Sequence, residues 1–167
     1  LEGGSELTSG QLGVDESQIV TYWNEGDLTW TLTADGTLTI SGSGAMKDYG
    51  DGNSPAAQKK DSVKKVVIET GVTSIGNFAF CSCIRLTDIT IPGSVTSIGT
   101  YAFSGCTALT EVLLENGSTL TSENFGEVAD KVVTRWNEGN LTWTLDAEGT
   151  MAISGTGAMK DYSSSDS

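Results

Sequence analysis

The sequence predicts an α+β protein in which a short repeat solenoid with three parallel strands is closed by β-hairpin capping modules. Two duplications predict this architecture. A 23-residue unit occurs twice between Val72 and Ser118, as VTSIGNFAFCSCIRLTDITIPGS and then VTSIGTYAFSGCTALTEVLLENGS, which carries one extra residue. A segment with hairpin character also occurs twice, once before and once after this unit.

The 23-residue period places apolar residues at the same offsets in both units, with these aligned pairs: Val72 and Val95, Ile75 and Ile98, Phe80 and Phe103, Cys83 and Cys106, Leu86 and Leu109. Such a period is typical of leucine-rich repeats, in which each turn buries its apolar side chains against the next turn. The segment VKKVVIETG precedes the first unit as LTDITIPGS precedes the second. The array therefore has three strands but only two full repeats, so other segments must complete its core.

The flanking module is the obvious candidate to complete it. Val20–Tyr49 aligns without a gap with Val133–Tyr162, and 23 of the 30 positions are identical. Within the first copy, apolar residues alternate on both sides of Asp35-Gly36, a strong signal for a hairpin turn. We therefore expect a hairpin over Asp27–Ser41, with Trp30 and Ile40 on its buried face.

These patterns divide the chain into five parts. They are a linker or disordered terminus (1–18), a hairpin cap module with its loop (19–62), the leucine-rich repeats (63–118), a C-terminal closing segment (119–132) and a second, truncated hairpin module (133–167). Phe125, Val128 and Ala129 are spaced like one face of a short helix in the closing segment. The loop over residues 48–62 is expected to be solvated. Its Asp48, Asp51 and Asn53 lack the glutamate that completes a calcium loop, so no metal site is expected.

Composition excludes several partners. The formal net charge of −13 disfavours nucleic acid and anionic membranes, which require a basic surface. The cluster Lys59, Lys60, Lys64 and Lys65 is more simply a solvated patch than an anion site. No apolar run approaches the roughly 18 residues of a membrane span. The chain begins at Leu1 rather than Met, so we expect a processed product or a segment of a longer protein.

Residues for catalysis are scarce. The chain has no histidine, which removes Ser-His-Asp and Cys-His catalysis and the commonest zinc ligand. Cys83 and Cys106 share a repeat position and should stack inside the array as small apolar side chains, with a disulfide as the alternative. Cys81 aligns with Ser104 and is expected to be partly exposed. We expect no enzyme activity and no cofactor.

Two surfaces are candidates for binding. Period-two alternation turns six side chains outward on the strand face of the array: Lys65, Val67, Asp88, Thr90, Glu111 and Leu113. Solenoids usually bind on this face, although an ordinary solvated sheet surface is the simpler interpretation. Four tryptophans could instead stack on sugars, but their alternating positions in the hairpins favour packing against the core: Trp23, Trp30, Trp136 and Trp143.

The pattern VTSIGxxAFxxCxxLxxIxIPxS, at Val72–Ser94, resembles the BspA-like leucine-rich repeat. The segments LTWTLTADGTLTISGSGAMKDY and VKKVVIETGVTSIG are similar to the stretch that introduces those repeats. The resemblance implies a surface-exposed or secreted bacterial protein, located outside the cell, that adheres to host proteins or other cells without catalysis. Ala56 departs from the pattern, because the family usually places an aromatic residue after the loop proline.

We therefore expect a non-catalytic adhesion fragment that binds a host or bacterial surface protein through the strand face. A carbohydrate-binding module that takes a glycan partner, and a structural spacer in a longer tandem-repeat protein, are the alternatives. The second hairpin module, which lacks its own full array, could pack on the same molecule or on a neighbour, giving a swapped homo-oligomer.

Overall fold

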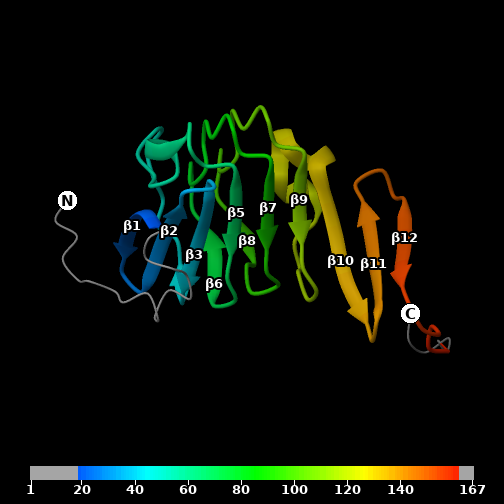
Figure 1. Cartoon of the computed structure of the whole chain (residues 1–167). Coiled ribbons are helices and arrows are strands. Elements are labelled where there is room, and N and C mark those ends of the chain that lie inside the picture. The colour runs from blue at the N-terminus through cyan, green and yellow to red at the C-terminus, as the bar shows by residue number, and fades with distance from the viewer. Residues whose placement is uncertain (1–18, 162–167) are drawn as a thin grey trace.

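Strands dominate residues 19–161, the part of the chain that this computed structural model describes. The predicted linker at 1–18 lies outside these residues. Nine strands form one open sheet in the order β1-β2-β3-β5-β7-β9-β10-β11-β12, and three form a small sheet in the order β4-β6-β8 (Figure 1). The bounds of the large sheet are β1 (Ile19–Glu25), β2 (Leu28–Thr33), β3 (Thr37–Gly42), β5 (Lys65–Ile68), β7 (Asp88–Ile91), β9 (Glu111–Leu114), β10 (Val132–Glu138), β11 (Leu141–Asp146) and β12 (Met151–Gly155). Those of the small sheet are β4 (Gly44–Ala45), β6 (Val72–Ile75) and β8 (Ser97–Ile98).

The helical part of the expected α+β class is small. Residues 19–161 contain two 3-10 helices, η2 (Ala57–Lys59) and η3 (Ser122–Lys131), and no α-helix. Helix η3 is interrupted at Gly126, where φ is 54°. Turns of 3-10 helix are frequent as connectors between other elements.

The predicted hairpin of the first module is confirmed. Strands β2 and β3 pair antiparallel, with Trp30 opposite Ile40, and both side chains are fully buried. Strand β1 adds to the other side of β2 and places Trp23 opposite Trp30. The carboxylate of Glu25 accepts hydrogen bonds from Lys47 N at 2.9 Å and from the hydroxyl of Tyr49. Burial, together with that contact, raises the pKa of Tyr49.

Five neighbouring strands pair in parallel, because the two hairpin modules each contribute one. Strand β3 pairs with β5, β5 with β7, β7 with β9, and β9 with β10. The register aligns the buried side chains in a row across all five strands: Leu38, Val66, Ile89, Val112 and Val132. The row extends the core of the array into both flanking modules.

An aromatic stack runs through the core beside these strands. Ring centroids lie 6.2 Å apart between Tyr49 and Trp30, and 5.9 Å apart between Trp30 and Phe80. The stack continues from Phe80 to Phe103 at 5.6 Å and from Phe103 to Phe125 at 5.9 Å. Contacts at these distances add to the burial energy of the rings. Phe125 therefore belongs to the same core as the two aligned repeats.

The closing segment behaves as a further repeat turn. Phe125 and Val128 are buried as expected, and the chain then continues into β10, which pairs with β9. The segment does not end the sheet, because β10, β11 and β12 continue it at the C-terminal end (Figure 1). The second hairpin module thus packs on the repeats of its own molecule.

The loop over residues 48–62 is less solvated than expected. Ser54, Pro55, Ala56 and Ala57 are all buried, and Ser54 Oγ accepts a hydrogen bond from Ala57 N at 3.0 Å. Ala56 joins the hydrophobic core at the position where the resemblance places an aromatic residue. The prediction of a solvated loop is therefore wrong for these four residues, because their short side chains let the turn pack against the core.

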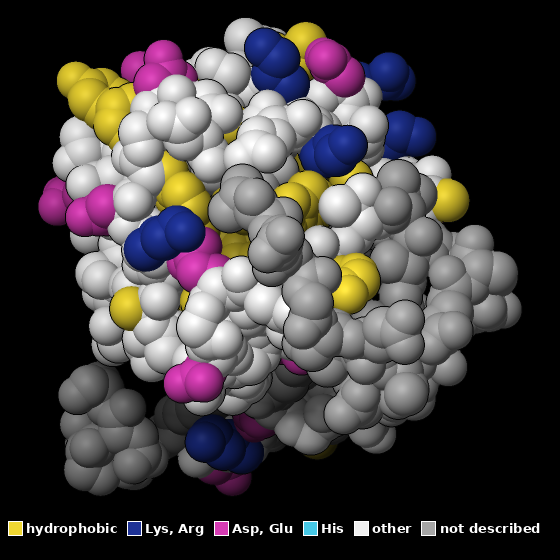
Figure 2. All heavy atoms as spheres, turned by 90° about the vertical axis from the view of Figure 1, so that its left-hand side faces the viewer, with side chains coloured by type: hydrophobic (Ala, Val, Ile, Leu, Met, Phe, Trp, Pro, Cys, Tyr) yellow, Lys and Arg dark blue, Asp and Glu magenta, His cyan; other side chains and the backbone are white. Residues whose placement is uncertain are grey.

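Viewed from the β1 end, the described surface shows acidic, basic and apolar side chains interspersed (Figure 2). No large field of one charge covers the visible part of this end. The acidic net charge of the chain is therefore spread out here rather than concentrated.

Candidate binding surfaces

The six predicted strand-face residues lie on adjacent parallel strands, two each on β5, β7 and β9. Lys65 is opposite Asp88, which is opposite Glu111, and the parallel row beside it contains Val67, Thr90 and Leu113. Lys65 and Glu111 are exposed, whereas Val67, Asp88 and Thr90 are half-exposed.

Leu113 differs from this expectation, since it is buried with only 6% of its surface exposed. Its neighbours in the row are Thr90 on β7 and Val133 on β10, and both have branched side chains. The three-strand array expected from the sequence ends at β9, which leaves Leu113 without a neighbour on one side. The addition of β10 explains the burial.

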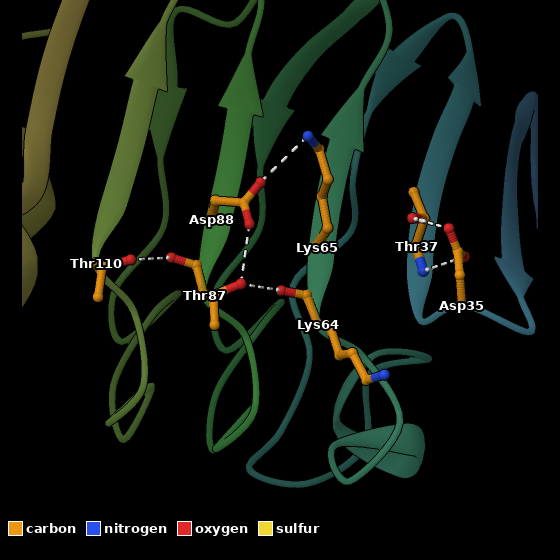
Figure 3. Close-up of polar contacts among 7 residues, drawn as sticks. All are labelled: Asp35, Thr37, Lys64, Lys65, Thr87, Asp88 and Thr110. Carbon is orange, nitrogen blue, oxygen red and sulfur yellow. Dashed lines mark hydrogen bonds and ion pairs between the residues drawn. The ribbon is translucent and has the colours of Figure 1, made fainter.

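The charged row is locally neutralised. Lys65 Nζ lies 3.3 Å from Asp88 Oδ1, and Thr87 Oγ1 lies 2.9 Å from Asp88 Oδ2 (Figure 3). The ion pair is largely solvent-exposed, so it orients the two side chains more than it stabilises the fold. Beyond it, the row ends at the exposed carboxylate of Glu111.

Hydrogen bonds between successive turns hold the start of these strands. Thr87 Oγ1 is 3.0 Å from Lys64 O, and Thr110 Oγ1 is 3.0 Å from Thr87 O, so each threonine donates to the carbonyl of the preceding turn (Figure 3). In the turn before β3, Asp35 accepts from the backbone N–H of Thr37 at 3.0 Å, and its bonds to Thr33 and Thr37 lower the pKa of Asp35. These contacts fix the spacing of the strand face.

A pocket of about 410 Å³, which was not predicted from the sequence, lies between residues 98–104 and 123–127. Tyr101 is 58% exposed at this pocket, and its ring lies 5.2 Å from that of Phe78, one repeat earlier. Ser104 Oγ donates to the carboxylate of Glu127 at 3.4 Å. The sequence contains one signal for this pocket, because Phe78 and Tyr101 occupy the same position in the two aligned repeats. An aromatic face beside carboxylates suits a cationic group.

The tryptophans do not form an exposed platform. Trp30 is fully buried, and Trp23 packs against the core. Trp136 and Trp143 are half-buried and stack on each other, with centroids 6.0 Å apart. Packing of Trp30 in the core is confirmed.

All three cysteines are free and buried. Cys83 and Cys106 lie in the core, as expected of small apolar side chains, and Cys106 Sγ donates to Phe80 O at 3.1 Å. Burial raises the pKa of Cys106 to about 12 and also raises the pKa of Cys83. The expected partial exposure of Cys81 is wrong, because its Sγ packs 3.5 Å from Asp51 Oδ1 in the loop.

Residues 19–161 hold no group of three or more cysteine, aspartate or glutamate side chains placed to bind a metal ion. The loop carboxylates considered for calcium have other partners. Asp48 Oδ1 accepts from Asn77 N at 2.8 Å, and Asp51 Oδ1 accepts from Cys81 Sγ. Within the same part of the chain, no helix has the length and apolar character needed to cross a membrane.

Comparison with known proteins identifies the repeats. Residues 54–130 match the family described as BspA type Leucine rich repeat region (6 copies). A leucine-rich repeat protein from Eubacterium ventriosum is 24% identical over 81% of this chain and 48% of its own length, with a TM-score of 0.49. A leucine rich cell surface protein from Faecalibacterium prausnitzii is 17% identical over 80% of this chain and 60% of its own, with a TM-score of 0.32. No curated protein matches the chain.

The chain thus spans 48% and 60% of the lengths of these two solved structures. Its fold is of the leucine-rich-repeat type, mostly strands with few helices and with open sheets. The resemblance read from Val72–Ser94 is confirmed, because residues 54–130 match the BspA-type leucine-rich repeat family.

Proposed function

We propose that this chain is a non-catalytic protein-binding module of a bacterial surface or secreted protein, and that it binds through the strand face of β5, β7 and β9. The observation that carries the proposal is the regular row of side chains on this face. Successive turns present Lys65, Asp88 and Glu111 at one register, beside Val67 and Thr90 at the next. Repetition along a short solenoid produces an extended surface of this kind.

The chemistry of the face suits a protein partner. Val67 and Thr90 form a half-exposed centre, and the charged row forms one border. Protein interfaces commonly combine such a less polar centre with a polar rim. Because Lys65 is paired with Asp88, Glu111 contributes an unbalanced negative charge to the border. A partner with basic residues at this position would be favoured.

Adhesion outside the cell is part of the proposal. BspA-type repeats are typical of bacterial surface proteins and of protein–protein interaction, which supports an extracellular or cell-surface location. In this view residues 63–118 form the recognition unit and the hairpin modules complete its core. The partner class is a host or bacterial surface protein.

The test uses the purified 167-residue chain on immobilised extracellular-matrix proteins and, in parallel, on a glycan array. Thr90→Lys and Glu111→Lys change the strand face, whereas Thr73→Lys changes an exposed residue on β6 of the small sheet. We expect the chain to bind one of the proteins. Thr90→Lys should weaken this binding about tenfold or more, equivalent to about 1.4 kcal/mol, and Thr73→Lys should leave it unchanged. Binding that tolerates both strand-face changes, or binding to glycans alone, would overturn the proposal.

A spacer function is the second candidate, because the chain contains two nearly identical hairpin modules with 23 of 30 positions in common. Tandem duplication extends a molecule without requiring a ligand. A lack of binding to both the protein panel and the glycan array would favour the spacer function. A carbohydrate module built on the tryptophans has less support, since Trp30 is fully buried and Trp136 covers Trp143.

A further inference from the structure

The two hairpin modules share their geometry as well as their sequence. In the first, Lys47 N donates to Glu25 Oε1 at 2.9 Å; in the second, Lys160 N donates to Glu138 Oε1 at 2.8 Å. The strand pairing is also the same, with tryptophan opposite isoleucine on the last two strands of each module. The second module therefore presents on β12 the surface that the first presents on β3.

In the first module that surface is covered by β5. Lys64 N and Lys65 N donate to Gly36 O at 2.8 and 3.2 Å, and Glu69 N donates to Ile40 O at 2.9 Å. Apolar side chains meet at the same time, because Leu38 and Ile40 are opposite Val66 and Ile68. Both the strand edge and the apolar face of β3 are thus occupied by one repeat turn.

In the second module, no strand among residues 19–161 covers the same surface. All five residues of β12 are exposed, and β12 is the last strand in the sheet. Three apolar side chains show the difference most clearly. Met151, Ile153 and Met159 are 52%, 46% and 55% exposed, whereas their counterparts Leu38, Ile40 and Met46 are 0%, 0% and 4% exposed.

The turns before β3 and β12 differ in the same way, because a neighbouring segment passes close to Gly36 but not to Gly149. A Cβ added to Gly36 would lie 2.7 Å from Ser62 O and 2.9 Å from Lys64 Cγ, which shows how closely the segment before β5 passes. A Cβ added to the equivalent Gly149 would meet nothing within 4 Å. The carbonyls that correspond to those of Gly36 and Ile40 belong to Gly149 and Ile153.

We propose that the edge of β12, Met151–Gly155, is an acceptor site for a parallel strand of a further leucine-rich repeat. The added strand has the sequence pattern of residues 63–69. Its apolar side chains lie opposite Met151 and Ile153, as Val66 and Ile68 lie opposite Leu38 and Ile40. Its N–H groups pair with Gly149 O and Ile153 O, in the way that β5 pairs with β3. Addition of a strand to an open sheet edge is a common mode of recognition, in which main-chain bonds supply affinity and alternate side chains supply specificity.

The occupant is a repeat strand other than those of a second copy of this chain. In each copy, β5, β7 and β9 are paired on both edges, so none of them can reach a neighbour without leaving its own sheet. The donor is therefore a repeat segment whose strand has no partner of its own. A second copy is kept as an outcome of the experiment below.

The first experiment titrates the full chain with a synthetic peptide of residues 62–80, SVKKVVIETGVTSIGNFAF, by calorimetry. Hydrogen exchange then locates the binding. We expect saturable one-to-one binding and protection of the amides of β12. A peptide with Val66→Lys and Ile68→Lys should bind at least about tenfold more weakly, because lysines would be forced against the apolar face.

A matched pair of chain variants identifies the site. Ile153→Lys places a charge on the apolar face at a residue that is already 46% exposed, so the hairpin itself need not change. Ser154→Lys places the same charge on the opposite face of the same strand. We expect the first change to abolish peptide binding and the second to preserve it. Equal binding to the Ile153→Lys chain would overturn the proposal, because the peptide would then occupy another site.

A second experiment supplies the strand in the same molecule, by appending a copy of residues 50–118 after Tyr162. Tethering raises the effective concentration of a weakly bound strand. We expect protection of β12 and resistance of the appended copy to proteolysis. Failure of the peptide together with failure of the extended chain would overturn the proposal. A dimer of the original chain, detected by light scattering and dissociated by Ile153→Lys, would also overturn the proposal. In that case a second copy of the chain would cover the edge of β12.

Discussion

Trp30 of the first hairpin lies against Phe80 of the first repeat, with ring centroids 5.9 Å apart. This contact joins a module to the repeat array. The equivalent Trp143 of the second hairpin has no repeat phenylalanine among its ring contacts and stacks instead on Trp136. The same residue in nearly the same local sequence therefore has two different environments.

Trp30→Ala and Trp143→Ala form a matched pair that measures this difference. Trp30→Ala should lower the free energy of unfolding by about 3–5 kcal/mol, because it leaves a cavity beside Phe80 and Tyr49. Trp143→Ala should cost clearly less, since its ring is half-exposed. Urea denaturation followed by circular dichroism gives both values. Equal costs would contradict the structure.

Phe103 stands in the middle of the stack between Phe80 and Phe125. Phe103→Ala should destabilise the protein by about 3–5 kcal/mol, whereas Phe103→Leu retains most of the volume and should cost less than about 1.5 kcal/mol. Because the stack links the two repeats to η3, the alanine variant should also increase hydrogen exchange in Ser122–Lys131. An unchanged exchange rate there would show that η3 is held without the stack.

Alanine substitutions at Gly36 and Gly149 test the free edge of β12 through the free energy of unfolding alone. Both have positive φ, +93° and +85°, so alanine at either position pays about 1–2 kcal/mol for the left-handed conformation. Only Gly36→Ala also places a Cβ 2.7 Å from Ser62 O. We expect it to cost roughly 1–3 kcal/mol more than Gly149→Ala, measured by thermal and urea unfolding. Equal costs would show that the turn before β5 moves aside to admit the added Cβ.

The buried thiols predict a pH dependence. Burial raises the pKa of Cys106 from 9.0 to about 12, so the folded state holds this proton more tightly than the unfolded chain does. The resulting stabilisation is complete below pH 9.0 and is lost as the pH rises toward 12. At pH 8 the native thiols should react slowly with a disulfide reagent such as dithiobisnitrobenzoate, and rapidly in denaturant. Fast native reaction would show that the core opens around the cysteines. Cys106→Ala provides the control for the pH dependence.

The repeat and the hairpin can both be predicted from the sequence, because the patterns that indicate them are local. Alternating apolar residues around Asp35-Gly36 predict the hairpin, and its pairing of Trp30 with Ile40 is confirmed. The recurrence of VTSIG and its following apolar positions predicts the family, which the match over residues 54–130 confirms. Fixed spacing is sufficient for these conclusions, because each repeat places its own side chains toward the core.

The burial of Leu113 could not be predicted in the same way. Its own strand alternates correctly, but its exposure depends on Val133, 20 residues later in a different module. The short loop side chains from Ser54 to Ala57 are a similar case, since small residues pack or remain in water according to what surrounds them. The pocket beside Tyr101 likewise forms only when η3 comes to lie next to the second repeat.

By itself, the sequence determined which segments are repeats, which are hairpins and which side chains are apolar at each period. Only the tertiary structure decided how the two hairpins join the array: the first through β3 and the second through β10. Pairing between distant segments depends on which strand edges are free once neighbouring strands have formed, and a local pattern does not contain that information. For this reason Ile40 and Ile153, identical residues in equivalent positions, end with one fully buried and the other exposed.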